Sequence, residues 1–346
     1  MNVSDSHHFE FKFHWLNEQG SQTTMFAKKG SFDGDTLILE KTEIPAVAIA
    51  NSIVRENRMV ISVMTGDEAN PVAHLLFQPA SKKVTDELKA QLDVARSGVW
   101  ARHHREQLEK KGLGHTYRDE ECPICQATIV LTDMKESPQL YCHFCDSLIT
   151  IDSSEQPVKK EESFKICEEC GMYSRPQKFT IFYFYFLLVV YGWWSKATWR
   201  CPACMRGEAW KMFFGNLLFV LGVPVAVVQL YRSYTGDAIG GTFKGLDTGN
   251  IRAKNGNVSG ALEQYRQILD RVPYSAGVKY NLGMALLLQG DHERAAQTFE
   301  LALEDCSNYV PAAGQLRMLY EKLGEAEKLK ALNRVWSDAD VEETSE

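Results

Sequence analysis

Apolar and polar residues alternate near the start of the chain, where residues 9–15 read FEFKFHW. A period of two is typical of a strand with one buried face, so this segment is predicted to be a strand. Further short runs of β-prone residues follow, separated by glycine-containing turn signals. They lie at residues 23–27, 36–40, 47–49, 59–64 and 73–77.

The pattern changes to a helical period after these strands. Apolar residues recur three or four positions apart, at Val84, Leu88, Leu92, Ala95 and Val99. Thr85 suits the start of this helix and Gly112 its end. Strands followed by one helix resemble a pleckstrin-homology-like β-barrel of the PH and GRAM groups, and GDTLIL at residues 34–39 looks like the early strands of bacterial members. The resemblance predicts such a domain over residues 9–112 and implies a phosphoinositide or peptide ligand.

Two long apolar runs lie in the middle of the chain. Residues 179–194 (FTIFYFYFLLVVYGWW) and 212–231 (MFFGNLLFVLGVPVAVVQLY) contain no charged residue. About twenty apolar residues cover the ~30 Å hydrocarbon core of a bilayer, and Trp and Tyr are enriched at its interfaces. The runs therefore predict two hydrophobic membrane segments. The alternatives are that residues 180–186 form a strand, because they are β-branched and aromatic, and that both runs belong to the core of a soluble domain.

The predicted topology places most of the chain on the cytosolic side of a membrane. The segment 195–211 between the two runs carries four basic residues and one acidic residue. Basic loops stay on the cytosolic side, so residues 179–194 are expected to dip into the bilayer without crossing it. Two full spans remain the alternative, and residues 212–231 could span or dip.

Composition narrows the function. The 346 residues suggest two to three domains, and a net charge of −7 with a pI near 5.8 disfavours a nucleic-acid binder, which needs a basic surface. Nine cysteines without a secretory signal at the start of the sequence are expected to be reduced thiols rather than disulfides. Eight of them form four C-x-x-C pairs, and the ninth, Cys306, is expected to be a buried apolar residue.

The first two cysteine pairs have the spacing of a zinc ribbon. Cys122 and Cys125 are followed, sixteen residues later, by Cys142 and Cys145. Zinc prefers four soft ligands in a tetrahedron, and two such turns supply four thiolates. The motif resembles a zinc ribbon over residues 113–152, with a closed structural site. A redox role for one pair is the alternative.

The second two pairs enclose the first apolar run. Cys167 and Cys170 precede it, and Cys201 and Cys204 follow it. This order is similar to the LITAF-type domain, which implies one zinc ion shared by the two pairs and an intervening segment embedded in a membrane. The resemblance predicts a second four-cysteine zinc site over residues 165–211.

A 34-residue self-similarity begins after residue 249, and a period of this length indicates a repeat array. Gly256 and Ala261 recur as Gly290 and Ala295. The pattern resembles tetratricopeptide repeats over residues 250–336, which implies paired helices and a concave groove for an extended peptide or a partner helix. Polar or glycine-rich connections and an acidic tail are predicted at residues 153–164, 232–249 and 337–346.

These patterns predict a multidomain α+β protein with a PH-like barrel, zinc ribbons, two membrane segments and C-terminal tetratricopeptide hairpins. No phosphate-binding, zinc-protease, hydrolase or dinucleotide-binding motif occurs in the sequence. We therefore expect a membrane-associated scaffold with two structural Zn²⁺ sites, which binds a protein or peptide and membrane lipid, and not an enzyme. The alternatives are a zinc-ribbon regulator that contacts nucleic acid and an enzyme without a recognisable motif.

Overall fold

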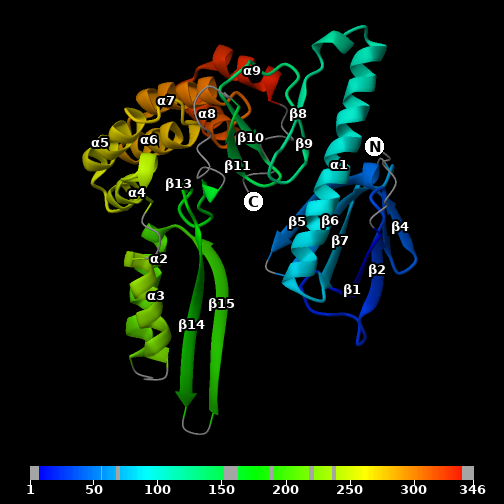
Figure 1. Cartoon of the computed structure of the whole chain (residues 1–346), viewed down its shortest axis with the longest axis horizontal. Coiled ribbons are helices and arrows are strands. Elements are labelled where there is room, and N and C mark those ends of the chain that lie inside the picture. Colours follow the sequence, from blue (N-terminus) through cyan, green and yellow to red (C-terminus); the bar gives the residue numbers. More distant parts are fainter. Residues whose placement is uncertain are drawn as a thin grey trace. The chain divides into compact units, whose positions relative to one another are not determined.

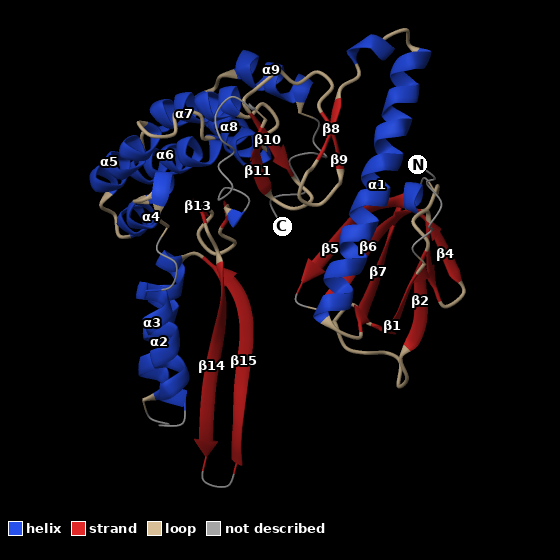
Figure 2. Ribbon diagram, in the orientation of Figure 1, coloured by secondary structure: helices blue, strands red, loops and turns tan. Residues whose placement is uncertain are grey.

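The computed structural model describes residues 8–55, 57–67, 71–151, 163–187, 190–217, 222–235 and 239–336. The chain divides into two compact units, Met1–Thr132 and Asp133–Glu346. Figures 1 and 2 show the helices and strands of each unit.

The first unit contains a seven-stranded antiparallel sheet with the strand order β4-β3-β2-β1-β7-β6-β5. The strands are β1 (Phe9–Trp15), β2 (Lys28–Phe32), β3 (Thr36–Leu39), β4 (Thr42–Pro45), β5 (Ile49–Arg55), β6 (Arg58–Met64) and β7 (Val72–Pro79), with a short 3-10 helix, η1 (Ala46–Ala48), before β5. The strand predicted at residues 9–15 is present. The strand predicted at 23–27 is not, because this segment is a loop in which Met25 and Phe26 are exposed.

A long helix, α1 (Lys82–Lys110), lies across one face of this sheet (Figure 2). It begins earlier than predicted, because the side chain of Ser81 caps it by accepting a hydrogen bond from the Val84 N–H. Leu88 and Leu92 are buried against Phe13 of β1, as the helical period indicated. The helix is followed by η2 (Gly114–Thr116) and by a hairpin of β8 (Asp119–Glu121) and β9 (Thr128–Val130). The resemblance to a pleckstrin-homology-like barrel stays a prediction.

The second unit begins with three hairpins. They are β10 (Gln139–Cys142) with β11 (Ser147–Thr150), β12 (Lys165–Ile166) with β13 (Tyr173–Ser174), and β14 (Gln177–Leu187) with β15 (Val190–Arg200). The third is much longer than the others, as Figure 1 shows. Two helices, α2 (Pro202–Asn216) and α3 (Val223–Thr235), follow it and pack beside β14.

The predicted membrane segments are wrong. Residues 179–194 fall in the β14–β15 hairpin, where the pairing runs from Gln177 opposite Arg200 to Leu187 opposite Val190. β-branched and aromatic residues favour such pleated, half-buried surfaces, so the strand alternative was right for this run. Residues 212–231 are divided between α2 and α3, which are separate helices. In the described part of the chain, no helix is both long and apolar enough to cross a membrane, which overturns the predicted membrane localisation as well.

A small core explains where part of this apolar sequence goes. Phe179 and Ile181 of β14 are buried against Met205 and Met212 of α2 and against Ala226 of α3. Alternate residues of a strand point to one face, so this face of β14 covers the two helices.

Six helices complete the second unit as three consecutive antiparallel pairs, following the 3-10 turn η5 (Gly241–Phe243). They are α4 (Leu246–Lys254), α5 (Val258–Leu269), α6 (Ala276–Gln289), α7 (His292–Asp305), α8 (Val310–Leu323) and α9 (Ala326–Val335). Small residues allow the paired helices to approach: a Cβ at Gly283 would lie 2.7 Å from the ring of Phe299. Gly290 and Gly324 end α6 and α8 in the left-handed conformation that glycine adopts without strain.

Candidate metal centres

The first half of one cysteine site is the tight turn between β12 and β13. The Cys167 N–H donates to the Met172 carbonyl at 2.9 Å, and the Gly171 N–H donates to the Cys167 carbonyl at 2.8 Å. Gly171 has a φ of 66°, a conformation that glycine adopts without a steric cost. The turn thus holds the side chains of Cys167 and Cys170 at one end of the hairpin.

The second half is the N-terminus of α2. Cys201 is the N-cap residue, its sulfur accepts a hydrogen bond from the Cys204 N–H at 3.5 Å, and Pro202 occupies the first helical turn. The Cys201 N–H also donates to the sulfur of Cys167 at 3.4 Å. Backbone N–H groups at a helix N-terminus stabilise negative charge, so this position favours thiolates.

The β14–β15 hairpin brings these two halves together. Its base pairs Gln177 with Arg200, so the chain leaves the first cysteine turn and returns directly to Cys201. The Cys167 and Cys204 sulfur atoms are 4.0 Å apart, and those of Cys170 and Cys201 are 3.6 Å apart. The thirty residues between the pairs were expected to need an inserted excursion, and that excursion is a hairpin.

The geometry of this group fits zinc. All four sulfur atoms lie within 4.8 Å of one another, and Cys167, Cys201 and Cys204 are buried. A tetrahedron with Zn–S bonds of about 2.3 Å places its sulfur atoms about 3.8 Å apart. Four protein thiolates fill all positions of a tetrahedral zinc ion and leave none for water or substrate. The residues are therefore those of a structural site.

Electrostatics within the group favour a cation. Hydrogen bonds from the thiols of Cys170, Cys201 and Cys204 lower the pKa of Cys167. Contact with Cys167 in turn raises the pKa of the Cys170 and Cys201 thiols. The first thiolate to form therefore opposes ionisation of its neighbours, and a bound divalent cation offsets this repulsion.

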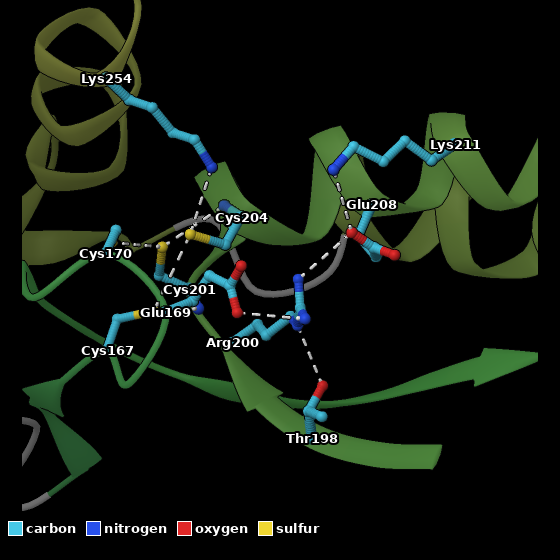
Figure 3. A network of polar contacts seen from close by, with 10 residues as sticks. All are labelled: Cys167, Glu169, Cys170, Thr198, Arg200, Cys201, Cys204, Glu208, Lys211 and Lys254. Atoms are coloured by element: carbon cyan, nitrogen blue, oxygen red, sulfur yellow. Dashed lines mark hydrogen bonds and ion pairs between the residues drawn. The ribbon is translucent and has the colours of Figure 1, made fainter. Parts of the chain in front are cut away.

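Charged side chains surround the sulfur atoms, as Figure 3 shows. Arg200 lies beside Cys201 and contacts Glu169 at 3.1 Å and Glu208 at 3.5 Å. Lys254 reaches from α4 and donates to the Cys204 sulfur at 3.4 Å. Burial alone lowers the pKa of Lys254, but the charge and hydrogen bond of Cys204 raise it above its ordinary value. The lysine thus stays cationic beside the thiolates.

The other predicted ligands also form a group of four. The sulfur atoms of Cys122, Cys125, Cys142 and Cys145 lie within 4.8 Å of one another. The structure thus contains two cysteine groups that could hold metal ions, as the C-x-x-C spacings indicated. Cys306 belongs to neither group and is buried in the helical core, consistent with the expectation of an apolar role.

The segment after Cys170 lies against the paired helices. Asn281 of α6 accepts a hydrogen bond from the Tyr173 N–H at 2.7 Å and donates to the Tyr173 carbonyl at 2.6 Å. Asn250 of α4 donates to the same carbonyl at 3.0 Å. Near the other group, Asn308 accepts from the Tyr141 N–H at 2.9 Å and donates to the Tyr141 carbonyl at 2.7 Å.

Sequence reasoning missed these asparagines, as well as the roles of Arg200 and Lys254. The available signal was weak: Asn281 is a polar residue in a mainly apolar helical segment, and it is fully buried. Buried polar groups need hydrogen-bond partners, but their partners here are distant in the sequence.

Comparisons with known proteins agree with the helical pairs. A protein-family model described as Tetratricopeptide repeat matches residues 246–311. The chain therefore contains tetratricopeptide repeats, as its 34-residue period predicted. Two solved structures of MamA resemble the chain, at 19% and 18% identity and TM-scores of 0.26 and 0.25. The first, whose title names AMB-1, covers 40% of this chain and 74% of its own, and the second, a point mutant, covers 39% and 98%. No curated protein matches the sequence significantly.

Proposed function

We propose that this protein is a zinc-stabilised adaptor that binds another protein through its tetratricopeptide module. The observation that carries the proposal is the joining of a closed four-cysteine group to that module. Lys254 of α4 contacts Cys204, and Asn281 of α6 holds the residue that follows the first cysteine turn. Tetratricopeptide arrays stack helix pairs into extended surfaces suited to protein binding.

The chemistry of the cysteine groups supports an adaptor rather than an enzyme. A catalytic zinc site keeps one position open, whereas each group here offers four sulfur ligands. Zinc at these residues would fold the short hairpins that carry them, since β12 and β13 are two residues long. The proposed zinc ligands are Cys122, Cys125, Cys142 and Cys145 in one site, and Cys167, Cys170, Cys201 and Cys204 in the other.

The test has two parts. The purified full chain is analysed for metal by mass spectrometry, and two zinc ions per chain are expected from the two cysteine groups. The full chain is then used as bait, and each captured protein is purified, titrated by calorimetry and cross-linked. Saturable binding with cross-links to residues 246–336 supports the proposal. Absence of zinc, or turnover of a small molecule without a saturable protein ligand, would contradict it.

A further inference from the structure

The asparagines of the tetratricopeptide module recognise main-chain groups. Asn281 pairs with both the N–H and the carbonyl of Tyr173, as Asn308 does with those of Tyr141. Every extended segment carries the same main-chain groups, so these bonds do not depend on the sequence that is bound. Because the arrangement occurs twice, it is a property of this face of the module.

The side-chain position beside Asn281 fits an aromatic residue. Tyr173 is 1% exposed, and its ring lies where a Cβ at Gly277 would come within 2.4 Å. Phe164 stacks on the same ring with centroids 5.6 Å apart, and Phe243 contacts Phe164. The missing side chain of Gly277 thus makes room for a flat ring. This part of the face selects an extended segment with an aromatic side chain.

The present occupant is connected to the metal centre. Tyr173 follows Cys170 by three residues, and the Cys167 N–H bonds to the carbonyl of Met172, next to Tyr173. Only short strands, β12 and β13, support this turn besides the cysteines and the buried aromatic residues. Metal bound by Cys167 and Cys170 would hold the turn in place, and metal loss would loosen it.

We propose that this face is a binding site for an extended, aromatic-bearing segment of a partner protein, and that the segment around Tyr173 occupies it while the Cys167 group holds zinc. The inference rests on the proposed adaptor function and adds the kind of partner and its control. Asn250 and Asn281 are buried, so an empty face would leave their amides without partners, and one segment must replace the other. A tethered segment has an effective concentration in the millimolar range, so a free partner competes only after metal loss weakens the tethered one.

The test uses the full chain and a fluorescent peptide with the sequence of residues 163–176. The peptide carries Cys167→Ser and Cys170→Ser, so that it binds no zinc. Binding is followed by fluorescence anisotropy with zinc-saturated protein and after removal of zinc by a chelator. We expect the peptide to bind at least about tenfold more tightly to the zinc-free chain. The Cys201→Ser/Cys204→Ser double variant should show the same tight binding without a chelator.

Matched controls identify the face. Asn281→Ala should weaken binding to the zinc-free chain roughly tenfold or more, whereas Asn333→Ala, at an exposed asparagine of α9, should not. A peptide with an N-methyl group at residue 173 lacks the donor N–H, and a Tyr173→Ala peptide lacks the ring. Both should bind at least about tenfold more weakly.

Several outcomes would overturn the inference. Equal binding with and without zinc, no binding after zinc removal, or binding unaffected by Asn281→Ala and by N-methylation would each do so. Loss of the helical circular dichroism signal on zinc removal would show that the face does not persist. A dimer formed on zinc removal without peptide would assign the face to a second copy of the chain. Each of these results leaves zinc content and capture of a protein partner unchanged, so the proposed function is tested separately.

Discussion

Arg200 contacts Glu169 at 3.1 Å and thereby joins the two halves of the Cys167 group. Arg200 directly precedes Cys201, and Glu169 lies between Cys167 and Cys170. Only 11% of the Arg200 side chain is exposed, and Glu208 of α2 contacts the same guanidinium. Groups that orient metal ligands in this way commonly affect metal affinity.

Replacement of this arginine tests its importance to the metal site. Arg200→Ala should weaken zinc binding by about tenfold or more, since removal of ligand-orienting groups costs about 10- to 100-fold. Competition with a chromophoric chelator measures the affinity. Lys211→Ala is the matched control, because Lys211 also contacts Glu208 but its side chain is 75% exposed. Equal affinities of the two variants would show that the Arg200 contacts do not support the site.

Lys254 offers a second test at the sulfur atoms themselves. Its ammonium group donates to Cys204 and withdraws negative charge from that thiolate. Lys254→Met should therefore speed zinc release by a thiol-alkylating reagent, by up to about fivefold because exposed ion pairs contribute about 0.2–1 kcal/mol. Zinc release is followed with a metal indicator, and Lys244→Met at an exposed loop residue should leave the rate unchanged. Slower release in Lys254→Met would contradict the assigned role.

Gly277 should not tolerate a methyl group. A Cβ there would lie 2.4 Å from the Tyr173 ring, whose main chain is held by Asn281. Gly277→Ala should lower the free energy of unfolding by about 1–3 kcal/mol, as overpacking does. Gly207→Ala is the control, because nothing lies within 4 Å of its added Cβ, and helix propensity should increase stability by up to about 1 kcal/mol. Urea denaturation measures both, and an unchanged Gly277→Ala variant would indicate that the ring moves freely.

Asp247 predicts a specific pH dependence. Burial raises its pKa from 3.8 to about 6, against hydrogen bonds from the Ile239 N–H and Ser174 and the charge of Arg206. The folded state therefore binds the proton more tightly, and the stability that this carboxyl contributes below pH 3.8 is lost as pH rises through about 6. Asp247→Asn should match the natural protein near pH 4 and be more stable by about 1–3 kcal/mol above pH 7.

This difference is read from denaturation curves of both proteins at each pH. Zinc loss at low pH affects both proteins alike and cancels in the comparison. A stability difference that does not change between pH 4 and pH 7 would show that Asp247 is not the titrating group.

Local patterns were sufficient for several elements of the fold. The alternation at residues 9–15 and the period of α1 depend on neighbours along the chain, so they could be predicted without a structure. The apolar runs misled because length and hydrophobicity are alike for a membrane segment and for a buried strand or helix pair. Pairing of β14 with β15, and the division between α2 and α3, resolved that ambiguity.

The sequence by itself determined the eight clustered cysteines and the tetratricopeptide repeats, because C-x-x-C spacing and a 34-residue period are written in neighbouring positions. Only the tertiary structure showed that the β14–β15 hairpin joins the two cysteine pairs, and that Arg200 and Lys254 surround them. It also decided that Asn281 binds Tyr173, a residue 108 positions away. Hydrogen bonds between such distant residues depend on how packed helices and hairpins meet, and no local pattern records that arrangement.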